Sequence, residues 1–276
     1  MVKKCFSNNK DIDVVLITSN ELRHKYVASF INDNYNLVGI LSEQKTKISR
    51  QKEDDKLVSE IIKSHFESRT NTELKVFGEY YDFPHGVDVL HLGRGESNSA
   101  ESFTWVSSKT PDVIILYGSC IIKDPLLSYY NNLIVNMHLG LSPYYRGSGT
   151  NFWPLVDRLP ECVGVTIHLA VSSVDAGPIL IQKRPDILYD DHSHEIGTKA
   201  IIAGLHSIRE IILPYLNGEV DPIDQDLSLG KEYRKKDFSV DSVHSMHQQF
   251  KSGMIKEFIE NHESREAKYP VIVYEK

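Results

Sequence analysis

Short apolar runs alternate with amphipathic segments along the first half of the chain. The runs at 11–18 and 112–119 and the run at 133–138 are rich in β-branched residues. The last two are apolar almost throughout, as in strands that helices cover on both faces of a parallel sheet. Segments with helical spacing lie between them, for example at 21–31. This alternation predicts a doubly wound, mostly parallel, Rossmann-like α/β sheet.

The second half of the chain continues with two strands and a long helix. The segments 164–171 and 178–184 have strand character, and 193–219 is a long amphipathic helix. After Gly218 the composition becomes polar. A single terminal helix is predicted from apolar residues at helical spacing, namely Val243, Met246, Phe250, Met254 and Phe258. We therefore expect one domain over 1–220 and a short helical C-terminal extension, 221–276, packed on it.

Composition narrows the classes of function. The chain has 276 residues and a formal net charge of −7, so a nucleic-acid partner is disfavoured, because such proteins present basic patches. No run reaches the ~20 apolar residues of a membrane span, and we expect a cytoplasmic protein. Three distant cysteines predict reduced thiols and no metal site. The pattern DDHSHE at 190–195 is interpreted as a helix start. Nothing in the pattern predicts an oligomeric state.

Two polar residues end the buried strand at 133–138, directly before a glycine-rich loop. Asn136 and His138 are two positions apart and therefore point to the same side of the strand. In an open α/β sheet, ligands bind beyond the carboxyl ends of the strands, so both residues are candidates for chemistry. Each could also be a structural polar residue. Asp175, in the turn between the two later strands, could equally bond its own backbone.

Three motifs in order resemble the catalytic domain of the folate-dependent formyltransferases. They are PDVIILYGS at 111–119, NMHLGLSPYYRG at 136–147 and GVTIHLAVSSVDAGPIL at 164–180. The family includes glycinamide ribonucleotide formyltransferase, the N-terminal domain of methionyl-tRNA formyltransferase and the sugar N-formyltransferases. Gly140 and Ser142 depart from the family pattern, in which serine and a second leucine stand there.

The resemblance implies 10-formyltetrahydrofolate as co-substrate and three catalytic residues. Asn136 would stabilise the oxyanion of a tetrahedral intermediate, a role worth about 3–4 kcal/mol for a side-chain amide. His138 would carry protons at neutral pH, and Asp175 would orient His138 or hold a water. His168 is a supporting residue by resemblance and a weaker candidate for the proton carrier.

The resemblance also implies two binding regions. The pterin ring would lie against 116–122 and 170–175, with Leu116, Tyr117, Gly118, Cys120, Ile121, Ile122 and Val174 as folate-binding residues. The acceptor would meet the loop after His138, with Ser142, Tyr144, Arg146 and Gly147 as binding residues. The aromatic residues Tyr144, Tyr145, Phe152 and Trp153 could stack on a base or hexose, or could instead pack at the start of the next helix.

The acceptor amine is the open part of this interpretation. Few residues follow Gly218, and the turn after the first strand, ITSNELRHKY, lacks the glycine-rich phosphate loop of glycinamide ribonucleotide enzymes. A nucleotide-linked amino sugar is therefore the first expectation. The alternatives are glycinamide ribonucleotide, methionyl-tRNA and hydrolysis of the formyl folate. Ser19 is predicted to cap the first helix. Arg23 and His24 are expected on a surface helix turn, with contact to an acceptor phosphate as the alternative. The charged segment 44–56 could close over a substrate, but nothing in its sequence decides its role.

Overall fold

The computed structural model describes residues 4–44 and 56–274. The predicted substrate-covering segment 44–56 falls almost entirely outside these ranges.

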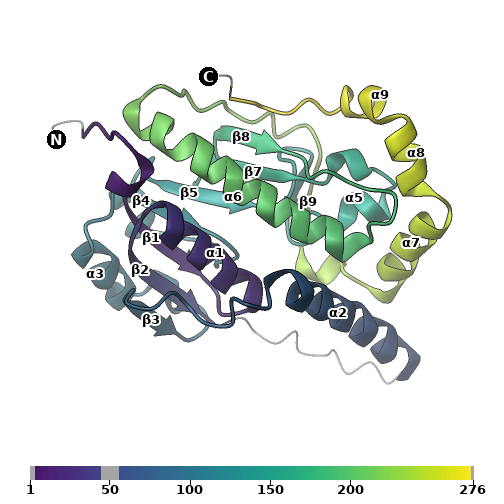
Figure 1. Ribbon diagram of the computed structural model, residues 1–276, viewed down its shortest axis with the longest axis horizontal. Helices are drawn as coiled ribbons and strands as arrows, with labels where there is room; N and C mark the ends of the chain where they lie inside the picture. Colours follow the sequence, from purple (N-terminus) through teal and green to yellow (C-terminus); the bar gives the residue numbers. More distant parts are fainter. Residues whose placement is uncertain (1–3, 45–55, 275–276) are drawn as a thin grey trace.

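A seven-stranded sheet forms the centre of the molecule, as the hydrophobic pattern predicts (Figure 1). Its strands in spatial order are β3 (Val89–Leu92), β2 (Asn36–Glu43), β1 (Asp13–Thr18), β4 (Val113–Leu116), β5 (Ile134–His138), β7 (Val165–Leu169) and β8 (Ile179–Lys183). The first five run parallel. β7 pairs antiparallel with β5, and β8 pairs antiparallel with β7, so β7 runs against the other six strands. The predicted doubly wound, mostly parallel sheet is confirmed.

Helices cover both faces of the sheet. The helices α1 (Leu22–Asn34) and α6 (Ser193–Asn217) lie side by side over one face in Figure 1, whereas α3 (Ala100–Ser108) and the short α4 (Leu126–Tyr129) pack on the other. The long α2 (Lys56–Phe77) contacts both α1 and α6. Successive side chains of a strand point to opposite faces of the sheet, so one strand contributes to both cores. Leu16, for example, faces α1, and Ile17 faces the opposite layer.

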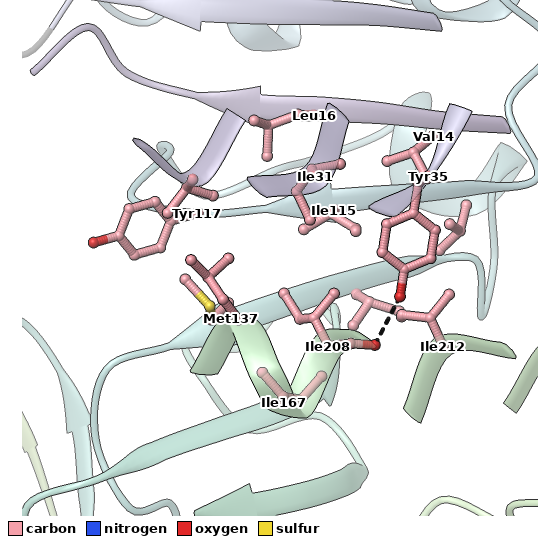
Figure 2. Close-up of a cluster of buried hydrophobic side chains, with 14 of the residues drawn as sticks. Val14, Leu16, Ile31, Tyr35, Ile115, Tyr117, Met137, Ile167, Ile208 and Ile212 are labelled. Atoms are coloured by element: carbon pink, nitrogen blue, oxygen red, sulfur yellow. Dashed lines mark hydrogen bonds between the residues drawn. The ribbon is translucent and has the colours of Figure 1, made fainter. Parts of the chain in front are cut away.

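The larger core joins the sheet to α1 and α6. Leu16, Ile115 and Met137 come from three neighbouring strands and meet Ile208 of α6 (Figure 2). Each fully buried apolar side chain contributes roughly 1.5–3 kcal/mol. At one end of this cluster the buried hydroxyl of Tyr35 donates a hydrogen bond to the carbonyl oxygen of Ile208 over 2.9 Å, so the phenol's polar atom is satisfied. This core fixes the ends of β4 and β5.

The start of α1 differs from the prediction. Glu21 is the N-cap residue, and the predicted cap, Ser19, is buried at the end of the first strand. Thr18 donates a hydrogen bond to the carbonyl oxygen of Tyr117 over 2.8 Å. The strand ends at Thr18, as the sequence pattern indicated, and the helix begins at Leu22 after a short bend.

The C-terminal part also differs from the prediction of one terminal helix. It forms α7 (Val240–Lys251), α8 (Met254–Glu260) and α9 (His262–Glu266). Gly253, with a φ of 82°, interrupts the helix in a left-handed conformation. The predicted apolar residues Met246 and Met254 are nevertheless buried together, against α5 (Trp153–Val156) and residues around it.

A second, two-stranded parallel sheet joins the loop after β5 to the C-terminal part. It pairs β6 (Tyr145–Gly147) with β9 (Lys231–Tyr233). Short 3-10 helices in the described part of the chain lie at Asn9–Asp11, Glu96–Asn98, Pro160–Cys162 and Lys235–Asp237. None of the helices within 4–44 and 56–274 has the length and apolar character that a membrane crossing requires.

Candidate active site

A cavity of about 790 Å³ opens at the carboxyl ends of β4 and β5. It lies beside the point where the strand order reverses, between β1 and β4, which is where open α/β sheets bind ligands. Asn136, His138, His168 and Asp175 all line it. The antiparallel pairing of β5 with β7 puts Asn136 directly opposite His168.

Asn136 has two partners within the protein. Its side-chain nitrogen donates to Oδ1 of Asp175 over 3.1 Å and lies 3.0 Å from Nε2 of His168. Nδ1 of His168 lies 2.9 Å from the carbonyl oxygen of Leu169. That carbonyl can only accept, so Nδ1 of His168 carries a proton. Nε2 of the same ring also lies 3.6 Å from Oδ1 of Asp175. The Asp175 carboxylate thus accepts from the Asn136 amide and orients it.

His138 is buried at the end of β5, between two oxygen atoms. Its Nδ1 lies 3.3 Å from Oδ2 of Asp175, and its Nε2 lies 3.1 Å from the carbonyl oxygen of Tyr145. An imidazolium would satisfy both oxygens, whereas a neutral ring has one proton for the two. This arrangement suits a group that gains and loses a proton.

Asp175 connects the network to two other segments. The backbone N–H of Gly147, in β6, donates to Oδ2 of Asp175 over 2.9 Å. The side-chain amide of Gln225 donates to the carbonyl oxygens of Asp175 and Gly177, over 3.0 and 2.6 Å. Asp175 has a φ of 47°, an uncommon conformation for a residue with a side chain. These contacts hold the turn in that conformation.

Burial and neighbouring charges shift the pKa values of His138 and Asp175 in opposite directions. Burial lowers the pKa of His138, and the Asp175 carboxylate partly offsets that effect. Burial alone would raise the pKa of Asp175, but His138, His168 and the N–H of Gly147 hold this pKa well below its usual range. Asp175 is thus an anion at neutral pH. Its charge is available to stabilise His138 whenever that ring is protonated.

The residues predicted to bind folate form one side of the cavity. All seven line it, namely Leu116, Tyr117, Gly118, Cys120, Ile121, Ile122 and Val174. We call this side the first arm. Gly118 has a φ of 62°, and Ile121 is half exposed. Tyr117 differs from the others, because its buried side chain belongs to the core beneath α1.

The residues predicted to bind the acceptor are placed less uniformly. Gly147 lines the cavity, whereas Ser142, Tyr144 and Arg146 are not among the described residues that line it. Ser142 is fully buried, and Tyr144 packs on Tyr269. Arg146 donates to the carbonyl oxygen of Leu227 over 3.5 Å.

The aromatic residues of the same loop pack inside the protein more than they face the cavity. Tyr145 and Trp153 are buried, and both stack on Tyr233 of β9, at centroid distances of 5.8 and 4.6 Å. Phe152 lines the cavity. Packing is therefore the better of the two interpretations for Tyr145 and Trp153.

A second arm of the cavity was not predicted from the sequence, apart from the alternative that Arg23 and His24 reach an acceptor phosphate. It is lined from α1, α2, the first turns of α6 and the segment after β9, by Arg23, His24, His65, Arg69, Glu73, His194, Gly197, Arg234 and Lys235 among others. Arg23, predicted to lie on the surface, is mostly buried and bonds to both oxygens of Glu73, over 2.8 and 3.0 Å, and to Glu21. His24 is fully buried. The buried carboxylate of Glu73 draws Arg23 inward, and no spacing in the sequence links positions 50 residues apart.

Residues 2–204 match the family model described as formyl transferase. The chain belongs to the formyl transferase family. The resemblance that the three sequence motifs indicated is confirmed. In the described ranges no group of three or more His, Cys, Asp or Glu side chains could hold a metal ion.

Curated relatives of this family member are methionyl-tRNA formyltransferases. The protein from Bacillus cytotoxicus is 26% identical over 218 residues, which are 78% of this chain and 62% of the relative. The protein from Halalkalibacterium halodurans is 34% identical over 118 residues, which are 42% of this chain and 37% of the relative. The chain thus spans about 37–62% of the length of these relatives.

Solved structures of formyltransferases share the fold. The N-formyltransferase from Helicobacter canadensis, in complex with folinic acid and dTDP-3-aminofucose, superposes with a TM-score of 0.54 at 15% identity, covering 87% of this chain and 80% of that one. Phosphoribosylglycinamide formyltransferase from Anaplasma phagocytophilum gives 0.53 at 14% identity, covering 76% and 89%. Identities this low support a shared fold.

Proposed function

We propose that the protein transfers the formyl group of 10-formyltetrahydrofolate to the amine of a small acceptor, a nucleotide-linked amino sugar. The observation that carries the proposal is the network of Asn136, His138 and Asp175 at the wall of a two-armed cavity. Residues 1–220 would supply the reacting groups, and the 221–276 extension would support them.

The network offers what formyl transfer requires. The acceptor nitrogen attacks the formyl carbon, a new C–N bond forms, and the carbonyl oxygen takes up negative charge that an amide donor such as Asn136 stabilises. Collapse breaks the bond to the folate nitrogen. The acceptor nitrogen loses one proton and the folate nitrogen gains one. His138, beside the charge of Asp175, is suited to carry that proton.

The first arm suits a flat heteroaromatic ring. Its walls are apolar at Leu116 and Ile122, and they include backbone at Gly118, where no side chain prevents close approach. A pterin has donors and acceptors that backbone groups can match. In the structure of the Helicobacter canadensis protein, which has the same fold, folinic acid is bound, and this supports folate as the occupant.

The choice of acceptor rests on three observations. The chain carries a net charge of −7, which disfavours a polyanionic RNA. A helix N-terminus can bind a phosphate, but the N-cap residue of α1 is Glu21. A phosphate at that position would therefore meet a carboxylate. Proteins of the same fold are solved with nucleotide-linked sugars, including PseJ from Anoxybacillus kamchatkensis with a UDP-linked formamido sugar and tetrahydrofolate (TM-score 0.51, 16% identity, 84% of this chain and 97% of that one).

Methionyl-tRNA is the second candidate acceptor, because the curated relatives carry that name. A side-by-side assay separates the two. We expect formylation of a 3- or 4-amino-deoxyhexose on a nucleoside diphosphate, and none of methionyl-tRNA or glycinamide ribonucleotide. Preferential formylation of either other acceptor would contradict the choice of acceptor. Release of tetrahydrofolate without any amine would instead indicate a hydrolase.

A further inference from the structure

The second arm of the cavity includes an unusual helix position. Gly197 is in the second turn of α6 and lines the cavity. Glycine weakens a helix relative to alanine. A Cβ built at Gly197 would meet no atom within 4 Å, so packing does not require glycine there. Its effect is to leave open space above the first turns of α6.

Cationic side chains line the same cavity as Gly197. Arg23, Arg69, Arg234 and Lys235 line the arm, against the carboxylates of Glu73 and Glu232. Counting Glu21, which pairs with Arg23, gives four cations and three anions, an excess of one positive charge. Lys235 is exposed and forms no ion pair with any residue of 4–44 or 56–274. The N-terminal end of a long helix adds positive potential.

Two cavity-lining residues each have a buried polar atom without a partner in the described part of the chain: His65 in the second arm, and Tyr117, whose backbone belongs to the first arm but whose ring contacts that of His24 in the second. Nδ1 of His65 and the hydroxyl of Tyr117 make no hydrogen bond within the described residues. The side chain of His65 is 92% buried, since the residue is 8% exposed, and its ring lies 4.6 Å from that of His194 on α6. Buried polar atoms are normally satisfied by protein, water or ligand. The unpartnered Nδ1 of His65, with the Tyr117 hydroxyl in the same cavity, indicates that the second arm receives a polar ligand.

We propose that the second arm binds the phosphoryl groups of the acceptor's nucleoside diphosphate, and that Gly197 provides the room for them. This inference rests on the proposed function. Lys235 and Arg234, on the segment after β9, would meet the phosphates from the outer side, and Arg69 and His194 from α2 and α6. The acceptor's amine would then point toward His138, and the folate would occupy the first arm.

Two substitutions test the subsite without touching the reacting groups. Gly197→Leu fills the open space, and leucine has the higher helix propensity, so the helix is retained. Lys235→Glu reverses an exposed charge. His206→Leu is the matched control, because His206 is an exposed residue of α6 that does not line the cavity. The probes are UDP, dTDP and inorganic pyrophosphate, titrated by calorimetry at two salt concentrations.

We expect UDP or dTDP to bind the unmodified protein, more weakly at higher salt. The Kd should rise at least about tenfold in Gly197→Leu and in Lys235→Glu, and should not change in His206→Leu. Binding of inorganic pyrophosphate, which has no nucleoside, would show that the phosphates are the recognised groups. A difference in Kd between UDP and dTDP would show that the nucleoside contributes as well. Unaltered affinity in both variants, or no binding of any probe, would overturn the proposal.

The same variants separate this inference from the proposed function. If UDP binding depends on Gly197 and Lys235 but no amino sugar is formylated, the function fails and the subsite stands. If an amino sugar is formylated with the same KM in both variants, the function stands and the subsite is overturned.

Discussion

The side-chain amide of Gln225 bonds to the backbone of Asp175, 50 positions earlier in the chain, over 3.0 Å. Asp175 is the residue whose carboxylate contacts Asn136 and His138. The predicted boundary at residue 220 therefore separates two residues that are in direct contact. The polar segment after Gly218 is a structural part of the candidate site.

Gln225→Ala should lower kcat by about tenfold and leave KM for folate unchanged. The substitution removes both donated hydrogen bonds to the Asp175 turn, a loss of about 1 kcal/mol each, so the carboxylate is less well oriented. Gln225→Glu should behave alike, because a carboxylate cannot donate to a carbonyl. Steady-state kinetics measure both parameters. Gln249→Ala, on α7, is the control, and equal losses in Gln225→Ala and Gln249→Ala would contradict the positioning role.

His138→Ala should reduce formyl transfer by about 10²–10⁴, the usual effect of removing a general acid–base group. The fold should persist, since the neighbouring core of β4 and β5 is intact. Turnover and the far-ultraviolet circular dichroism spectrum are the measurements, with exposed His244→Ala as the matched control. Retention of more than about a tenth of the unmodified rate would show that His138 is not the proton carrier.

Acid should destabilise the protein partly through His65. Burial lowers the pKa of His65 to about 3, whereas the unfolded chain titrates near ~6.5. The unfolded state thus binds the proton first as pH falls below ~6.5, and stability is lost from there downward. Between pH 7 and pH 5 this costs about 2 kcal/mol for one histidine.

His65→Gln should therefore show a smaller decrease in Tm between pH 7 and pH 5 than the unmodified protein. The exposed His85→Gln is the control, and its pH profile should match that of the unmodified protein. Parallel Tm profiles for His65→Gln and the unmodified protein would contradict this contribution.

Ile121→Asp should weaken folate binding about tenfold with little change in stability. Ile121 lies in the first arm with half of its surface exposed, so a carboxylate there is tolerated by the fold but sits against the expected pterin. 5-Formyltetrahydrofolate should raise the Tm of the unmodified protein by mass action, and the increase should be smaller in the variant. Leu188→Asp, an exposed apolar residue outside the cavity, should retain the full increase; equal increases in both variants would place folate elsewhere.

The sequence predicted what depends on local pattern. Alternating runs of β-branched residues identified the strands, and the end of β5 identified Asn136 and His138. It could not predict contacts made across the fold. Arg23 was expected on the surface, because nothing in the sequence pattern links it to its partner Glu73 on another helix. The ring contact between His65 and His194 likewise joins two helices, α2 and α6. The break at Gly253 was missed, because the apolar spacing of Met246 and Met254 continues through it.

Mass-spectrometric analysis of the acceptor tests the central claim most directly. The protein is incubated with 10-formyltetrahydrofolate and a nucleotide-linked amino-deoxyhexose, and both the formamide product and tetrahydrofolate are quantified, with Asn136→Ala in parallel. The account predicts one formamide per tetrahydrofolate released, and a rate lower by about 10²–10³ in the variant, as for loss of an oxyanion donor. Tetrahydrofolate without formamide, or an unchanged rate in Asn136→Ala, would contradict it.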